Sequence, residues 1–186
     1  MLDAALPLFA ERGYESTSVG DLATAAGVTK PVLYEHFSSK QELYVALVAR
    51  ETERLAGAVL AGFDAEAPLE ARLRALALET LSFARRHPDA ARLLIQLPVG
   101  DSAVIAAHES ARASARELVA AGILADPLFH PAPGLSRQKS AALLADLHTA
   151  LLERLVVYAI ERPEISVDVL GQIFVSVLWE GLSGTA

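Results

Sequence analysis

The chain contains no cysteine, and only one methionine and one tryptophan occur among its 186 residues. Without cysteine it has neither disulfides nor a thiol nucleophile, and a cysteine-based zinc site is excluded. Positive charge is also scarce, since 16 lysines and arginines stand against 23 acids and give a formal net charge of −7. This balance excludes a protein that coats polyanions through its overall charge, so any contact with DNA must come from a local surface.

Long apolar runs are missing as well. The most apolar stretch, LHTALLERLVVYAI, is interrupted by His148, Glu153 and Arg154. A membrane-spanning helix needs about 20 predominantly apolar residues, so no membrane span is predicted. No signal peptide is recognised, and we expect a cytoplasmic protein.

Enzyme motifs are missing too, since no G-x-S-x-G, Walker or G-x-G-x-x-G string occurs. His108 and Glu109 begin like H-E-x-x-H, but Arg112 stands where the second histidine of a zinc pair belongs. The histidines fall in different predicted elements, at positions 36, 87, 108, 130 and 148. We therefore predict no catalytic residue, no metal site and no cofactor.

Residues 18–40 carry the densest set of helix signals. Ser18 is followed three residues later by Asp21, which resembles a capping box at a helix start. Gly27 is expected to end that helix, because glycine takes a positive φ at little cost. A threonine cap and a proline in the first turn then begin the next helix. The stretch predicts two short helices joined by a tight turn, followed by a third helix start at Ser39-x-x-Glu42.

The rest of the chain keeps a helical period throughout. We predict an all-α fold of about nine helices, with an N-terminal three-helix domain over residues 1–45 and a larger helical domain over residues 46–186. Pro7 is expected to kink the first helix or to move its start to about residue 6. The later helices are expected at residues 40–60, 69–87, from 88 to about 95, 102–124, from Ser136 to Arg162, and from Ser166 onward.

Two runs of sequence resemble the TetR family of bacterial transcriptional regulators: LFAERGY, residues 8–14, and TSVGDLATAAGVTKPVLYEHFSSKQELY, residues 17–44. The GY, TSV, AAGV, LY-x-HF and SK-x-x-L elements occur in order and without gaps, which is more specific than a helical hairpin with a glycine in its turn. The resemblance implies a dimeric helix-turn-helix protein whose helix 29–37 enters the major groove, while the helix from about residue 39 touches the DNA backbone.

The resemblance assigns DNA contacts residue by residue. At the start of the second helix, Thr17 and Ser18 are expected to contact phosphate through hydroxyl and amide. At the tip of the recognition helix, the residues expected closest to base edges are Thr29, Lys30 and Pro31. Three more residues are expected to meet phosphate: Tyr34, His36 and Lys40. Simpler alternatives are that Tyr34 packs against the core of the three helices and that Lys40 is a solvated charge.

Some features of residues 1–45 oppose DNA binding. Three cations stand against six acids, a formal charge of −3, so nonspecific affinity from phosphate neutralisation should be low. Glu35 repels phosphate unless it points away or accepts from a cytosine amino group. Members of this family usually carry a basic segment before the first helix, whereas this sequence begins at Met1 just before that helix; either the protein lacks the segment or the segment lies upstream of Met1.

The resemblance implies that a small molecule enters the larger domain between the fourth helix and the following ones. It also implies that binding of this molecule shifts the fourth helix. The sequence of this domain is rich in leucine, valine and alanine with few polar groups, which favours an apolar or amphipathic ligand. The candidate ligand contacts are Phe83, Gln96, His108, Tyr158 and Trp179. The alternative is that each is an ordinary core or surface residue whose polar atoms are already bonded.

The last two helices are apolar over more than one face, so a partner helix pair is expected to cover them. The resemblance implies that they meet their copies across a two-fold axis in a four-helix interface. The candidate interface residues are Leu147, Leu151, Leu155, Leu170, Phe174 and Val177. Complete burial of both helices within one subunit is the alternative.

The sequence thus predicts a dimeric, ligand-responsive regulator, a repressor that binds a palindromic DNA operator and is released by a small apolar or amphipathic molecule. The rival hypothesis is a helical ligand-binding or interaction module that has lost DNA binding.

Overall fold

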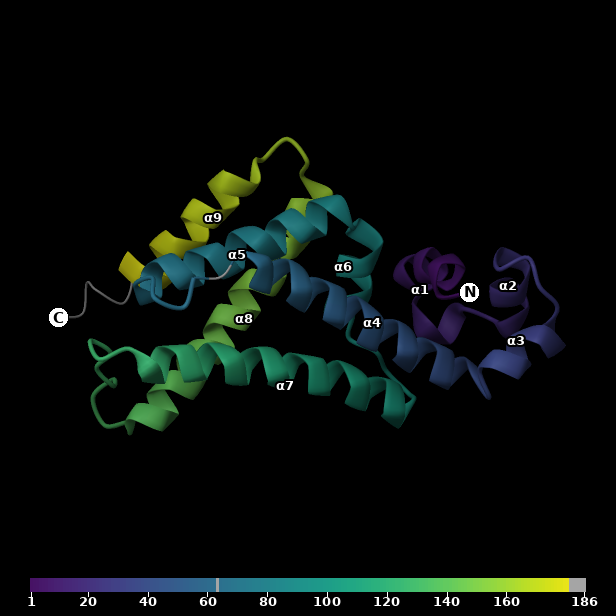
Figure 1. The fold of residues 1–186 in the computed structure, drawn as a ribbon, viewed down its shortest axis with the longest axis horizontal. Coiled ribbons are helices and arrows are strands. Elements are labelled where there is room, and N and C mark those ends of the chain that lie inside the picture. Colours follow the sequence, from purple (N-terminus) through teal and green to yellow (C-terminus); the bar gives the residue numbers. More distant parts are fainter. Residues whose placement is uncertain (63, 181–186) are drawn as a thin grey trace. The chain divides into compact units, whose positions relative to one another are not determined.

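The computed structural model describes residues 1–62 and 64–180, and within them all regular structure is helical (Figure 1). For residues 179 and 180 the description covers the backbone alone. The helices are α1 (Leu2–Ser16), α2 (Val19–Ala25), α3 (Lys30–His36), α4 (Lys40–Ala61), α5 (Leu69–Arg86), α6 (Pro88–Ile95), α7 (Ser102–Ala125), α8 (Arg137–Glu161) and α9 (Val167–Val175), which continues into a π-helical turn, η1 (Ser176–Glu180). The predicted all-α fold is confirmed.

Capping residues set several helix boundaries as the sequence predicts. The Ser136 hydroxyl accepts a hydrogen bond from the Lys139 amide at 3.2 Å, and the Ser166 hydroxyl accepts one from the Val169 amide at 3.3 Å. Pro88 occupies the first turn of α6, where its missing N–H has no helical partner to lose.

The chain divides into two compact units. The first unit contains Met1–Leu55 and His87–Ala111, and the second contains Ala56–Arg86 and the chain from Arg112. The first unit is therefore larger than the three-helix domain expected over residues 1–45, because Leu93 of α6 and Val104 of α7 share one buried core with residues of α1 and α4.

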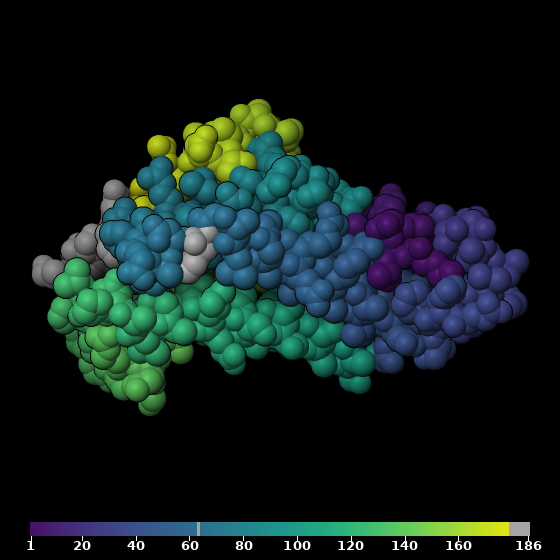
Figure 2. Space-filling model, viewed as in Figure 1, coloured from purple at the N-terminus to yellow at the C-terminus, as the bar shows by residue number. Residues whose placement is uncertain are grey.

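Aromatic rings form the centre of the first unit. The Tyr44 ring meets Phe9 edge-on at 4.8 Å between centroids and Tyr14 at 5.1 Å. Leu22 of α2 and Leu33 of α3 are each 1% exposed and pack on this cluster. Helices as short as α2 and α3 are not stable in isolation, so burial of these leucines, about 1.5–3 kcal/mol each, holds them in place. Figure 2 shows the atoms of α1 to α3, coloured purple to indigo, in close contact with one another.

Helix α1 is broken at a glycine, not at its proline. It starts at Leu2 and runs through Pro7 with helical geometry, so the expected kink or later start is wrong. Pro7 is the sixth residue of the helix, so it gives up the hydrogen bond that its amide would make to the Asp3 carbonyl, yet the backbone keeps helical φ and ψ there. The break comes at Gly13, whose φ of 75° and ψ of 173° are tolerated by glycine alone. The turn before α3 uses a second glycine as predicted, Gly27 with φ of 67°.

In the second unit, α5 packs along both α8 and α9 (Figure 1). Leu81 and Phe83 of α5 are buried, as are Leu170 and Phe174 of α9. The Arg85 guanidinium donates to the carbonyls of Arg162, at 3.1 Å, of Pro163, at 2.8 Å, and of Ile165, which joins the α8–α9 connection to α5.

Across residues 1–62 and 64–180, none of the helices combines the length and hydropathy needed to cross a bilayer.

Candidate DNA-binding surface

The first two helices of the turn are set by local hydrogen bonds. Ser18 begins α2 with a complete capping box: its hydroxyl accepts from the Asp21 amide at 3.1 Å, and the Asp21 carboxylate accepts from the Ser18 amide at 3.2 Å. The Ser18 hydrogen bonds lower the pKa of the Asp21 carboxyl, and the nearby charges of Arg12 and Lys30 lower it further. Thr29 precedes α3 in an extended conformation, and its hydroxyl makes no capping bond.

The outer face of α3 is exposed along its whole length. Leu33 is 1% exposed and fixes the inner face, whereas Tyr34 on the outer face is 48% exposed. Tyr34 therefore does not pack into the core, which was the alternative raised from its sequence position. The other exposed residues predicted for DNA contact on and beside this helix are Thr29, Lys30, Pro31 and His36.

Lys30 lies against the first turn of α2. A methyl group built on Gly20 would come within 3.4 Å of Lys30 Cε and 3.6 Å of Lys30 Nζ. The absence of a side chain at Gly20 leaves room for the lysine stem there. The Lys30 ammonium thus lies on the solvent side of the joint between the two helices of the turn.

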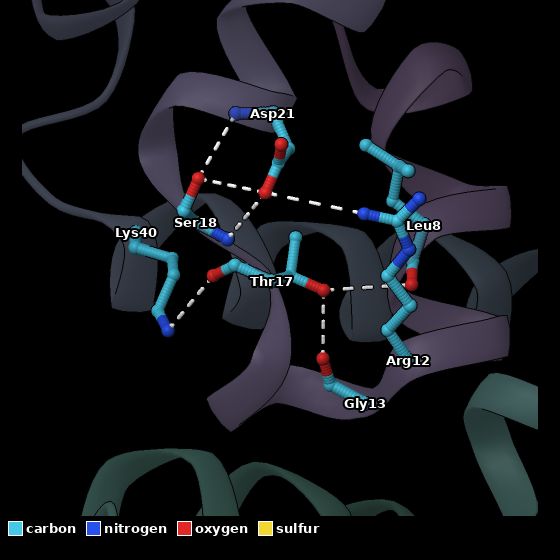
Figure 3. A network of polar contacts seen from close by, with 7 residues as sticks. All are labelled: Leu8, Arg12, Gly13, Thr17, Ser18, Asp21 and Lys40. Carbon is cyan, nitrogen blue, oxygen red and sulfur yellow. Dashed lines mark hydrogen bonds and ion pairs between the residues drawn. The ribbon is translucent and has the colours of Figure 1, made fainter.

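Thr17 and Ser18 do not offer their hydroxyls to DNA in this structure (Figure 3). The Thr17 side chain is 1% exposed, and its hydroxyl donates to the Gly13 carbonyl at 2.8 Å and the Leu8 carbonyl at 3.4 Å. The Ser18 hydroxyl donates to the Asp21 carboxylate at 2.7 Å. The Thr17 hydroxyl satisfies carbonyls near the break at Gly13, and the Ser18 hydroxyl and amide bond to Asp21. The phosphate contacts expected of these two residues stay a prediction.

Lys40 also has partners within the protein. Its ammonium donates to the Tyr14 carbonyl at 2.9 Å and to the Thr17 carbonyl at 3.1 Å, and it lies 4.1 Å from the centre of the Tyr14 ring. Figure 3 shows this side chain reaching the end of the α1 segment. Lys40 is thus not a freely solvated charge, and its phosphate contact stays a prediction. It connects the first residue of α4 to the carbonyls at the end of α1.

The start of α4 carries a modified capping box. The Ser39 hydroxyl accepts from the Glu42 amide at 3.1 Å as predicted, but the Glu42 carboxylate accepts from the Ser38 amide at 2.6 Å instead of the Ser39 amide. Hydrogen bonds from Ser38 lower the pKa of the Glu42 carboxyl. A carboxylate therefore already occupies the helix start where phosphate was expected.

A hydrogen-bond network around Asp101 joins α1, α4 and the start of α7, and sequence reasoning missed it. The Asp101 carboxylate accepts from Gln41 Nε2 at 2.7 Å and from the Tyr14 hydroxyl at 3.2 Å, and it also accepts from the Ala103 amide at the start of α7. Burial, with the charge and hydrogen bond of Asp101, raises the pKa of Tyr14 to about 12. The Asp-Ser pair at a helix start was the available signal, but its partners lie far away in sequence.

The predicted ligand contacts that the structure describes fall in both units. In the first unit, Gln96 Nε2 donates to the carbonyls of Phe9 and Ala10, and the buried His108 lies 3.0 Å from the Tyr44 hydroxyl through Nε2. In the second unit, Phe83 is buried, whereas Tyr158 is 38% exposed with the Arg154 guanidinium over its ring. The Trp179 side chain lies outside the described residues.

The predicted interface residues divide into buried and exposed sets. Leu155, Leu170 and Phe174 are buried within the second unit and are not available to a partner. Leu147 and Val177 are 51% and 57% exposed, and Leu151 is half-buried. The same helices also expose four large side chains that were not predicted as interface residues: Leu143, Tyr158, Val169 and Ile173.

Helices α2 and α3 are short and are joined by a glycine turn. Helix α3 is anchored by one buried leucine, and its outer face is exposed. This arrangement defines a helix-turn-helix protein. The sequence pattern described as bacterial regulatory proteins, tetR family, matches residues 1–47. Together with the similarities in sequence and fold described next, this match shows that the chain resembles the TetR family of transcriptional regulators.

Two curated relatives are similar to part of the chain. The HTH-type transcriptional activator FasR of Mycolicibacterium smegmatis is 36% identical over 96 residues, which cover 52% of this chain and 44% of FasR. The HTH-type transcriptional repressor KstR2 of Rhodococcus jostii is 41% identical over 75 residues, covering 38% of this chain and 37% of KstR2. The matches thus span less than half the length of either relative.

The similarity of fold extends over nearly the whole chain. A TetR-like transcriptional regulator from Rhodococcus sp. RHA1 matches with a TM-score of 0.82 and 27% identity, over 98% of this chain and 93% of that chain.

Proposed function

We propose that this protein is a dimeric transcriptional regulator that binds a palindromic DNA operator through α3 and represses until a small apolar or amphipathic molecule releases it. Its partners are double-stranded DNA, a second copy of the chain and that molecule. DNA binding is assigned to the first unit, and ligand binding and dimerisation to the rest of the chain.

The observation that carries the proposal is the exposed outer face of α3. Lys30 offers three N–H donors to guanine O6 or N7, and Tyr34 offers a hydroxyl to a phosphate oxygen. Thr29 adds a hydroxyl without a capping bond at the helix tip, where a recognition helix comes nearest to the bases. These groups lie on a helix whose inner face is anchored, so little ordering is needed on binding.

A dimer is required by the geometry of DNA. Two recognition helices enter successive major grooves on one face only when they lie about 34 to 36 Å apart. A molecule that favours a different spacing lowers affinity for the operator, which supplies a mechanism for release. The rival hypothesis keeps one specific support, because Glu35 is exposed on α3 and acids occupy the starts of α2 and α4.

The proposal is tested by selecting duplexes from a random DNA pool with the purified protein and measuring affinity for the selected duplex at two salt concentrations. We expect sequence-specific binding that weakens with salt. Lys30→Ala should reduce the affinity about tenfold or more and relax specificity at one base pair, since one good base contact is worth about 1–3 kcal/mol. Tyr34→Ala should weaken binding similarly for all sequences.

The matched control is Arg92→Ala, which removes an exposed cation of the first unit that pairs with Asp89 on α6. Its affinity for the selected duplex should equal that of the wild type. Enrichment of no sequence at low salt, from a folded dimer, would favour the rival hypothesis of a module without DNA binding.

A further inference from the structure

Helix α8 carries a histidine on its inward face that no part of the proposed mechanism uses. His148 is 4% exposed, and neither Nδ1 nor Nε2 has a hydrogen-bond partner among the described residues. It shares its face with other buried residues of α8, at helical spacing: Ala141, Ala145, Leu155 and Ala159. The exposed positions Leu143 and Leu147 lie on a different face of the helix. The partner of His148 must therefore come from inside the second unit and not from a second copy of the chain.

An apolar ring packs against His148. Its ring meets Phe174 of α9 edge-on, with centroids 4.9 Å apart, and Phe174 is 1% exposed. Burial lowers the pKa of His148 to about 4, so the imidazole is uncharged at neutral pH. A neutral imidazole presents one donor and one acceptor.

Leaving the donor and the acceptor of the buried imidazole unpaired lowers the stability of the fold. An unsatisfied buried polar group costs about 1–3 kcal/mol, and a leucine of similar size would avoid the cost. A buried water would need two to four polar partners, and the Phe174 ring that packs against His148 offers none. A histidine in this position is therefore explained by a molecule that enters the unit and pairs with it.

We propose that His148 is the polar contact of the effector site, and that the effector is an apolar molecule carrying one uncharged group that both donates and accepts a hydrogen bond, such as an alcohol or a primary amide. This inference rests on the proposed function for the existence of an effector, and it adds the class of molecule and the residue that selects it. The hydroxyl or amide donates a hydrogen bond to the unprotonated ring nitrogen, while the hydrocarbon part lies against residues such as Phe174.

The test uses three probes with the same octyl chain: 1-octanol, methyl octyl ether, which lacks the donor, and nonanoate, which is charged. Calorimetric titration of the wild-type protein should show 1-octanol binding about tenfold tighter than the other two, because each of these leaves a polar group unpaired or buries a charge. His148→Leu should abolish this preference. His148→Gln keeps a donor and an acceptor and should retain part of it.

The matched control is Thr149→Val, on the next residue of α8, whose hydroxyl donates to the Ala145 carbonyl of its own helix. This variant should keep the preference for 1-octanol. A second readout needs no ligand: His148→Leu should melt at a higher temperature than the wild type, since an unpaired polar group has been removed.

A lower melting temperature for His148→Leu would overturn the inference, because it would show that the imidazole has a partner inside the protein. Failure of all probes to bind the wild type, or equal preference in the wild type and His148→Leu, would overturn it as well. None of these measurements involves DNA. A negative result here is therefore independent of whether the protein binds an operator.

Discussion

Thr17 and Lys40 occupy positions expected to face phosphate, yet both are bonded within the first unit. The reason is the break at Gly13, which ends the regular hydrogen bonding of α1 and leaves carbonyls that need donors. The Thr17 hydroxyl bonds to the Gly13 carbonyl, and the Lys40 ammonium to the Tyr14 and Thr17 carbonyls. These side chains stabilise the segment between the end of α1 and the start of α2, which positions α2 and α3.

Lys40→Met is expected to destabilise the protein while keeping the hydrocarbon stem in place. Hydrogen bonds from a charged group contribute about 1.5–3 kcal/mol, and the contact with the Tyr14 ring adds to this. Urea unfolding followed by circular dichroism should show the loss, whereas Lys139→Met, at an exposed lysine of α8, should change little. Unchanged stability with weakened DNA binding would show instead that Lys40 acts mainly as a phosphate contact.

His148 predicts an acid dependence of stability. Its pKa is lowered by burial from 6.5 to about 4, so between these values the unfolded chain binds more protons than the folded one. The free energy of unfolding therefore falls as pH falls through this range, by about 2 kcal/mol at pH 5 for this group. Comparing urea unfolding of the wild type and His148→Leu at pH 7 and pH 5 isolates this part, and an equal pH response in both would contradict it.

At the scale of helices, glycines and caps set where the elements begin and end. Gly13 breaks α1 so that Tyr14 enters the aromatic cluster of the first unit, and Gly27 turns the chain between α2 and α3. The serine caps of α2, α8 and α9 satisfy amides that the helices leave unpaired. The orientation of α3 thus depends on a few local conformations.

Gly13→Ala should be destabilising by about 1–3 kcal/mol, because its φ and ψ are strained for a residue with a Cβ. The matched substitution is Gly57→Ala in α4, where a Cβ meets open space and the backbone is helical. That change should stabilise by about 0.5–1 kcal/mol, since glycine is a poor helix former. Thermal melting of the two variants should therefore move in opposite directions, and shifts of the same sign would contradict this account.

At the scale of the whole molecule, the exposed apolar residues of α8 and α9 are the main unexplained surface. Leu143, Leu147, Val169, Ile173 and Val177 are each 45–57% exposed. A second copy of the chain covers them in the proposed dimer, and burial would stabilise it at about 25 cal/mol per Å² of apolar area.

Leu147→Glu combined with Ile173→Glu should convert the dimer to a monomer, because two carboxylates would be buried at the centre of the interface. Sedimentation equilibrium would measure this directly. The control is Leu118→Glu, at an exposed leucine of α7, which should leave the mass unchanged. A dimer that persists in the double variant would place the interface elsewhere.

Much of this protein was readable from local sequence. The capping box at Ser18, the turn at Gly27 and the caps at Ser136 and Ser166 act over three or four residues, so helix number and boundaries followed from the residues themselves. The exposure of Tyr34 opposite the buried Leu33 also matches helical spacing. The break at Gly13 was missed because Pro7 was the stronger signal.

The remaining features depend on contacts between residues far apart in the chain. Helix α8 is apolar on several faces, so periodicity did not separate the buried Leu155 from the exposed Leu147. The partners of Lys40 lie 23 and 26 residues away, and α6 joins the unit built by α1 only in three dimensions. The lack of a hydrogen-bond partner for His148 is likewise visible only when α9 is packed against α8. The sequence shows that a side chain needs a hydrogen bond, but the fold decides which partners it meets.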